Sequence, residues 1–107
     1  MVTVSLLSIA AVYFDKAMAI DPADTDALNS KGVALDSLGN YTGAIVYYDK
    51  VLAIDPADTD ALNNKGFALG ELGNYTGAIV YYDKALAIDP AYTLALNNKG
   101  LALAKLR

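Results

Sequence analysis

Two groups of closely spaced aspartates have the clearest chemical potential in this sequence. The first group is Asp21, Asp24 and Asp26, and the same spacing returns as Asp55, Asp58 and Asp60. A calcium loop needs alternating oxygen ligands, a central glycine and a bidentate glutamate at its end, and neither group shows that pattern. Carboxylates just before a helix instead accept hydrogen bonds from its free N–H groups. The spacing therefore predicts helix caps and no metal site.

Catalytic side chains are scarce, because the sequence contains no cysteine and no histidine. This composition excludes disulfides, thiolate chemistry and the metal sites that these residues build. A serine or threonine nucleophile would need activation by a lysine, and there is no glycine-rich phosphate loop. We therefore expect a protein that is not an enzyme and uses no cofactor. The lack of cysteine fits a reducing compartment, and we expect the cytoplasm.

Length and charge narrow the class of protein and its partners. The 107 residues carry a net charge of −4, with 55% hydrophobic and 19% charged residues, which is typical of one globular domain. No basic run is present, so we expect no nucleic acid and no anionic membrane surface as partner. The apolar stretch 2–14 is too short to span a bilayer and lacks the preceding Lys or Arg of an export signal. A helix is the better interpretation.

The chain repeats itself with a period of 34 residues. The tetrapeptide at 21–24 (Asp-Pro-Ala-Asp) recurs at 55–58, and in modified form at 89–92. Residues 25–58 and 59–92 are identical at 28 of 34 positions. Residues 1–24 match the second half of a unit, and residues 93–107 match the first half. A period of this length is typical of an array of helical hairpins.

Within each unit the apolar spacing is helical. One helix face is formed by residues at spacings of three and four, namely Ala27, Leu28, Lys31, Gly32, Leu35 and Leu38. A second apolar stripe runs through 44–54. Gly39 suits a left-handed C-cap between the two stripes, Asn40 can cap the second helix, and Pro56 prevents that helix from continuing. Each unit is therefore predicted to be helix A, a tight turn, and an antiparallel helix B.

These residues resemble the tetratricopeptide repeat (TPR) family, which has the same period and helix–turn–helix form. The matching positions are Leu28, Gly32, Leu35, Ala44, Tyr48 and Pro56, and in the second full unit Leu62, Gly66, Leu69, Ala78, Tyr82 and Pro90. The resemblance implies an all-α solenoid with helices in the order B-A-B-A-B-A over residues 1–107. One departure is a lysine, Lys31, Lys65 or Lys99, where the family usually has a large apolar residue. We expect its aliphatic stem to pack and its ammonium to reach solvent or a nearby Asp.

The family's ligands lie in a concave groove lined by helices A, so the resemblance also implies a binding site for a peptide or a partner helix. The implied residues are Asp26, Asn29, Val33, Asp36, Ser37, Asp60, Asn63, Asn64, Phe67, Glu71, Tyr92, Leu94, Asn97 and Leu101. Of the six positions at which the two full units differ, four lie on this surface: 33/67, 36/70, 37/71 and 58/92. Because the implied groove is acidic, we expect a basic or neutral apolar segment as partner.

Both ends of the chain stop halfway through a unit and carry exposed apolar residues in the predicted helices. The residues expected to mediate self-association are Val4, Leu6, Leu7, Ile9, Leu96, Leu103 and Leu106. Such patches normally mark interfaces, so we expect a homo-oligomer, either an open head-to-tail stack or a closed dimer. The alternative is a first helix that folds back or frays. The abrupt ends also suggest a piece of a longer array.

Overall fold

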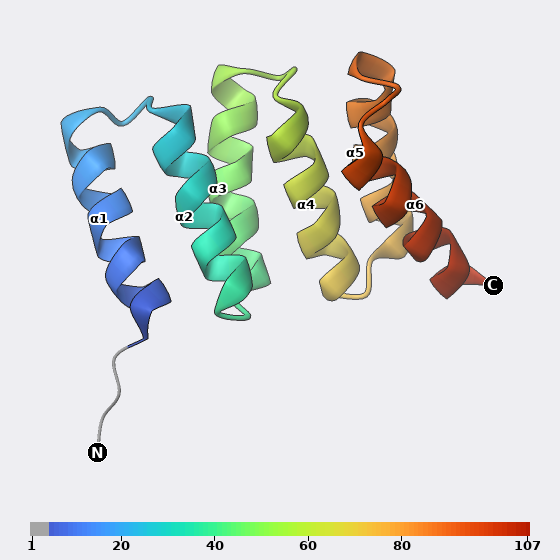
Figure 1. Ribbon diagram of the computed structural model, residues 1–107, viewed down its shortest axis with the longest axis horizontal. Helices are drawn as coiled ribbons and strands as arrows, with labels where there is room; N and C mark the ends of the chain where they lie inside the picture. The colour runs from blue at the N-terminus through green and yellow to red at the C-terminus, as the bar shows by residue number, and fades with distance from the viewer. Residues whose placement is uncertain (1–4) are drawn as a thin grey trace.

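Residues 5–107 of the computed structural model are described here; they form six helices joined by short turns (Figure 1). The helices are α1 (Leu6–Ile20), α2 (Thr25–Ser37), α3 (Tyr41–Ile54), α4 (Thr59–Glu71), α5 (Tyr75–Ile88) and α6 (Thr93–Leu106). The predicted all-α solenoid is therefore confirmed, and α6 occupies the half unit at 93–107. Within the described residues, no helix is long and apolar enough to cross a membrane.

The helix ends follow from the local sequence. Asp24 and Asp58 cap α2 and α4 through their side chains, and Asn40 and Asn74 do the same for α3 and α5. The turns between helices A and B contain Gly39, whose φ of 81° lies in the left-handed region that glycine adopts without strain. The predicted caps at Asp24, Asp58 and Asn40 are confirmed, whereas Asp26 and Asp60 lie in the first turns of α2 and α4 and make no capping bond in the described structure.

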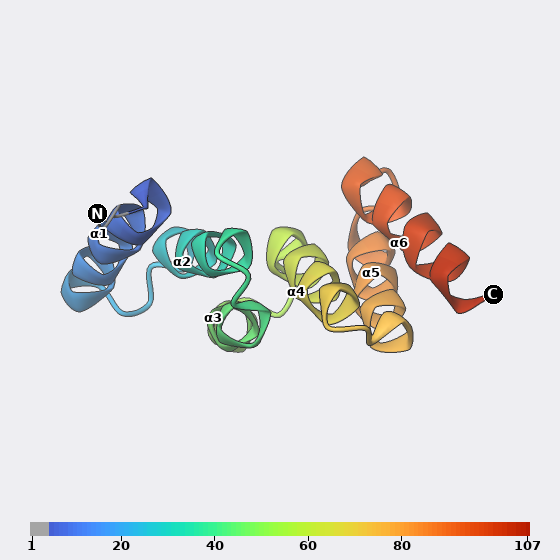
Figure 2. The same ribbon diagram turned by 90° about the horizontal axis from the view of Figure 1, so that it is seen from below.

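The helices pack in sequence order, each against the next, with a second set of contacts between helices A. Helix α2 also contacts α4, and α4 also contacts α6, whereas α3 and α5 do not contact each other in the described structure. Figure 2 shows α3 set to one side of α2 and α4. Because helices A also contact the next helix A, whereas helices B do not contact the next helix B, helices A form the inner, more closely packed layer of the solenoid.

The core consists of small clusters, each formed by a helix A, its helix B and the next helix A. In one cluster Ala44 and Tyr48 from α3 pack against Ala68 from α4, and Ala78, Tyr82 and Ala102 repeat this arrangement 34 residues later. Alanine at these positions allows the helices to approach closely, and the large tyrosine rings add apolar area to each cluster.

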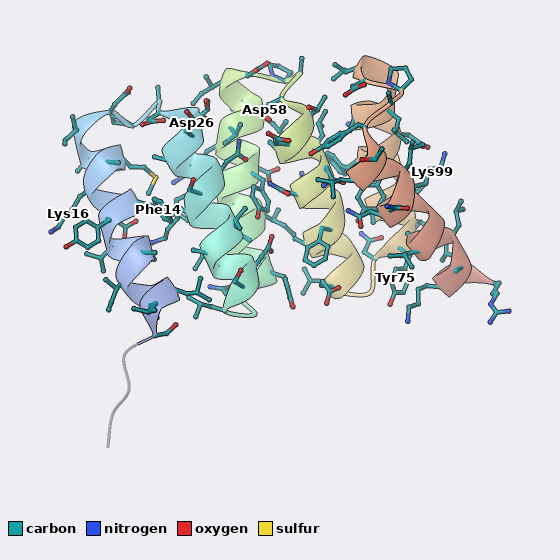
Figure 3. All side chains as sticks on the ribbon, viewed as in Figure 1. Phe14, Lys16, Asp26, Asp58, Tyr75 and Lys99 are labelled. Carbon is teal, nitrogen blue, oxygen red and sulfur yellow. The ribbon has the colours of Figure 1, made fainter. Side chains whose placement is uncertain are left out.

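The lysines of helices A behave as predicted. Lys31, Lys65 and Lys99 form ion pairs with an aspartate of the preceding helix B, at Nζ–O distances of 2.8, 2.6 and 2.6 Å. Lys65 also lies over the ring of Tyr81, with Nζ 4.4 Å from its centroid. Lys99 is marked on α6 in Figure 3. Each pair ties a helix A to the helix B before it.

Candidate functional site

The inner surface carries a groove of about 620 Å³ that extends from α1 to the start of α6. Residues of α2 form its longest wall. The predicted residues that line it are Asp26, Asn29, Val33, Ser37, Asp60, Asn64, Tyr92 and Leu94. These side chains come from α2, from α4 and from the start of α6, and stacking of helices A brings them together. We refer to this surface as the groove.

Helix α1 contributes an apolar wall to the groove that the groove prediction missed. Leu7, Ala10 and Phe14 line it, together with Ser30 and Ala34 of α2. The repeat itself held the signal, because Phe14 lies 34 residues before the buried Tyr48 and therefore faces the same side of its helix. Leu7 had been predicted for self-association instead.

The mouth of the groove is negatively charged. The exposed Asp26 and Asp60 both line it, and no Lys or Arg is among its described lining residues. The Tyr92 hydroxyl donates a hydrogen bond to Asp60 Oδ1 at 2.7 Å. Burial and this bond to Asp60 raise the pKa of Tyr92 above its ordinary value, so the phenol stays neutral. Figure 3 shows Asp26 at one end of α2.

Asn29 lines the groove and has one unused hydrogen-bonding atom. Its Nδ2 donates to Asp58 Oδ2 at 3.3 Å, while its Oδ1 is buried and accepts no hydrogen bond in the described structure. A buried carbonyl oxygen without a donor is costly. Because Oδ1 is buried, the Asn29 side chain must turn toward the groove before a ligand there can donate a hydrogen bond to it.

Three predicted groove residues lie elsewhere. Asn63 is only 4% exposed, and its Oδ1 accepts a hydrogen bond from Asn98 Nδ2 at 3.1 Å. Asp36 points between helices, where its Oδ2 accepts a hydrogen bond from the Tyr48 hydroxyl at 2.5 Å. Asn97 is exposed but lines no described cavity. Asn63 and Asp36 are held by neighbouring side chains and are not available to a ligand in this conformation.

A second cavity of about 320 Å³ lies between α4, α5 and α6, and we call it the Gly70 pocket. It takes in the other predicted residues, Phe67, Glu71 and Leu101. Its remaining walls are Gly70, Tyr75, Tyr82, Asn98, Ala102 and Lys105. Gly70 is one of the six positions at which the two full units differ, and that difference was the sequence signal for this cavity.

The residues predicted for self-association are exposed wherever they are described. They are Leu6, Leu7, Ile9, Leu96, Leu103 and Leu106, and Leu6 has the largest exposed fraction at 82%. Val4 lies outside the described residues. Within residues 5–107, no group of three His, Cys, Asp or Glu residues could hold a metal ion.

Known proteins share both the repeat sequence and the helical arrangement of this chain. The tetratricopeptide repeat family model matches residues 25–58 and 59–92. No curated protein matches the chain in sequence. Among solved structures, the first TPR domain of Spaghetti (RPAP3), bound to the HSP90 peptide SRMEEVD, superposes with a TM-score of 0.89 at 21% identity. That match covers 94% of this chain and 79% of the other.

Two further structures are similar over most of the chain. YrrB, a TPR protein with an unusual peptide-binding site, has a TM-score of 0.84 and 30% identity, over 88% of this chain and 48% of its own. The Sgt2 TPR domain from Aspergillus fumigatus has a TM-score of 0.88 and 20% identity, over 94% and 68%. The family model covers both full repeats and these structures share the helical arrangement, so the chain belongs to the tetratricopeptide repeat family.

Proposed function

We propose that this chain is a protein-interaction module that holds a peptide or a partner helix in the groove. The observation that carries the proposal is the groove's combination of apolar walls, an acidic mouth and asparagine side chains. Leu7, Phe14 and Val33 offer apolar surface, and the Asn29 amide, once its side chain turns toward the groove, can accept a backbone N–H of an extended chain. Two similar proteins support the reading, since Spaghetti binds a peptide and YrrB has a peptide-binding site. We place this activity in the cytoplasm.

The charge of the groove favours a basic or neutral apolar segment. Asp26 and Asp60 repel an acidic ligand, and the nearby carboxylate of Asp58 adds to the negative potential. The HSP90 peptide SRMEEVD carries three acidic residues and a single arginine. We therefore expect this chain to bind it more weakly than a peptide in which the acidic residues are replaced by lysine.

Fluorescence anisotropy with this pair of labelled peptides tests the proposal. The native chain should prefer the lysine-substituted peptide, and the double variant Asp26→Lys/Asp60→Lys should reverse that preference. Asp21→Lys combined with Asp55→Lys is a matched control, because it makes the same charge change in turns outside the groove. Equal binding of the lysine-substituted peptide by the native chain and the groove variant contradicts the proposal.

A second candidate function is self-assembly, which one specific feature favours. In α2 and α4 a tyrosine of the following helix covers the glycine, Tyr48 over Gly32 and Tyr82 over Gly66. Gly100 holds the same position in α6, and nothing lies within 4 Å of where its Cβ would be. Phe14 holds the tyrosine's position in α1. A second copy of the 107-residue chain could therefore place its α1 against α6, with Phe14 over Gly100.

Light scattering after gel filtration tests this candidate at tens of micromolar protein. The native chain should exceed the mass of a monomer, and Gly100→Ala should reduce it to a monomer, because the added Cβ would meet the incoming Phe14 ring. Leu38→Ala is a control that removes an exposed apolar side chain from the turn between α2 and α3. A monomeric native chain rules out the stacking.

A further inference from the structure

The glycine at the base of the Gly70 pocket is not required by the fold. Gly70 lies inside α4 without a positive φ, and a Cβ built on it would meet only Ala78 Cβ, at 3.8 Å, an ordinary contact. Glycine inside a helix is less favourable than alanine by about 0.5–1 kcal/mol. The fold would therefore accept a side chain here, and its absence leaves the pocket open.

The first full repeat shows what fills this space when a side chain is present. Asp36 holds the position of Gly70, and its carboxyl accepts the hydrogen bond from the Tyr48 hydroxyl. Phe67, from the next helix A, covers the corresponding space in the first repeat. Its ring lies edge-on to Tyr41 at a centroid distance of 6.5 Å. In the second repeat the cavity remains, with about 320 Å³ of space, room for roughly ten water molecules.

The polar groups left in the pocket are mostly acceptors. The Tyr82 hydroxyl makes no side-chain hydrogen bond in the described structure and can both donate and accept, because burial together with the negative charge of Glu71 raises its pKa to about 12. Asn98 uses its Nδ2 on Asn63, which leaves its Oδ1 as an acceptor. Glu71 contributes a carboxylate, while the one cation of the pocket, Lys105, is exposed on the last turn of α6.

We propose that the Gly70 pocket receives the side chain of an arginine or lysine from the segment bound to the inner surface, so this assignment rests on the proposed function. The aliphatic stem lies between Phe67 and Leu101, and the cationic head meets Glu71 and the Tyr82 oxygen. Leu101 is 67% exposed, so its covering by a stem removes apolar area from water. An arginine also stacks its planar head on an aromatic ring such as Phe67 or Tyr75.

The Glu71 carboxylate disfavours an acidic occupant, while Lys105 lies on the exposed last turn of α6. A carboxylate could copy the bond that Asp36 makes, but it would lie beside Glu71, and like charges at that range disfavour each other. The first repeat already shows this effect, because Glu71 contributes to the raised pKa of Asp36. The position that corresponds to Glu71 there is Ser37, which is neutral. The second repeat therefore lacks the side chain that fills the space, and its carboxylate lies one position further along, at Glu71.

NMR titration with small probes tests the assignment without a known partner. The probes are n-butylguanidinium chloride, sodium valerate and 1-butanol, added to the ¹⁵N-labelled chain. The backbone amide of Gly70 is the reporter, and butylguanidinium should shift it saturably with a Kd on the order of millimolar. Valerate and butanol should bind at least about 5-fold more weakly, since a fivefold ratio corresponds to roughly 1 kcal/mol of charge interaction.

Variants identify the groups involved. Glu71→Gln should weaken butylguanidinium several-fold, and Lys105→Gln should strengthen it. Gly70→Asn should abolish the saturable shift of the remaining pocket amides, because the new side chain fills the space and reaches the Tyr82 hydroxyl as Asp36 reaches Tyr48. Equal or tighter binding of valerate, unchanged binding by Gly70→Asn, or no saturable shift in the native chain overturns the assignment.

The groove variant separates this assignment from the proposed function. Asp26→Lys/Asp60→Lys should leave the butylguanidinium shifts of Gly70 unchanged, because neither aspartate lines the pocket. If that variant loses the preference for the basic peptide but butylguanidinium gives no saturable shift of the Gly70 amide in the native chain, only the pocket assignment is wrong. If butylguanidinium saturates the pocket while peptide binding does not respond to the groove charges, the groove proposal is wrong and the pocket stands as a cation site.

Discussion

The ring of Tyr82 lies directly over Gly66, so that a Cβ built on the glycine would be 2.6 Å from Cε1 of the ring. The backbone oxygen of Ala78 would be 3.1 Å from the same Cβ. Glycine is therefore the residue that allows α4 and α5 to approach at this point. Gly100 in α6 has the same place in the repeat but no neighbour within 4 Å.

Alanine at these two glycines should have opposite effects on stability. Gly66→Ala should lower the free energy of unfolding by about 1–2 kcal/mol, because overpacking exceeds the gain in helix propensity. Gly100→Ala should raise it by about 0.5–1 kcal/mol, since only the propensity term remains. Urea denaturation followed by circular dichroism, at concentrations where both variants are monomeric, measures the difference. If both substitutions raise the free energy of unfolding, the Tyr82 ring moves aside without cost.

Asp36 should make stability depend on pH between about 4 and 6. Burial raises its pKa from 3.8 to about 6, the Tyr48 hydrogen bond opposes this rise, and Glu71 on α4 adds to it. The folded chain therefore holds the Asp36 proton more tightly than the unfolded chain, and stability falls as pH rises through this window. With allowance for solvent screening, the loss should be about 1–2 kcal/mol.

Asp36→Asn isolates this contribution. The amide can still accept the Tyr48 hydrogen bond but cannot titrate, so the stability difference between native chain and variant should change across the window. Below pH 4 the free energy of unfolding of the native chain should be highest relative to that of the variant. Above pH 6 the difference between the two should be constant. Urea titrations at several pH values measure it, and a difference that does not vary with pH would place the Asp36 pKa at its ordinary value.

Asp58 links two helices and should be costly to remove. Its Oδ1 accepts a hydrogen bond from the Ala61 N–H at 3.0 Å, which caps α4, and its Oδ2 accepts from Asn29 on α2. Asp58→Ala should lower the free energy of unfolding by about 2 kcal/mol. Half of this loss comes from the cap and half from the Asn29 amide that is left unpaired. Asp24→Ala is the matched control, since Asp24 makes only the capping bonds, and it should lose about 1 kcal/mol. Equal losses would mean that the Asn29 bond contributes nothing.

The lysine–aspartate pairs should contribute little to stability despite their short distances. Lys65 and Asp49 are 2.6 Å apart, but half of the Asp49 side chain is exposed. Asp49→Asn should therefore cost no more than about 0.5–1 kcal/mol. The cost should nearly disappear in about 1 M salt, where the Debye length is about 3 Å. Thermal denaturation at low and high salt measures it, and a cost that persists at high salt would indicate a packing role for Asp49.

The sequence by itself determined the helices, the turns and the order of the repeats. Glycine at the left-handed position, aspartate and asparagine at the caps, and apolar residues at intervals of three and four all act within one unit. For the lysines, the sequence predicted that the ammonium reaches solvent or a nearby aspartate, and packing against the preceding helix B selected the aspartate. Local stereochemistry and periodicity are enough for the helices, the turns and the order of the repeats.

The tertiary structure decided which side chains reach a ligand. Periodicity gives the direction in which Asp36 and Asn63 leave their helices, but Tyr48 and Asn98 on neighbouring helices take up their polar atoms. The Gly70 pocket likewise depends on what α5 and α6 place around an absent side chain. A helix can direct a side chain toward a surface, whereas only the packing of its neighbours decides whether that surface is filled or open.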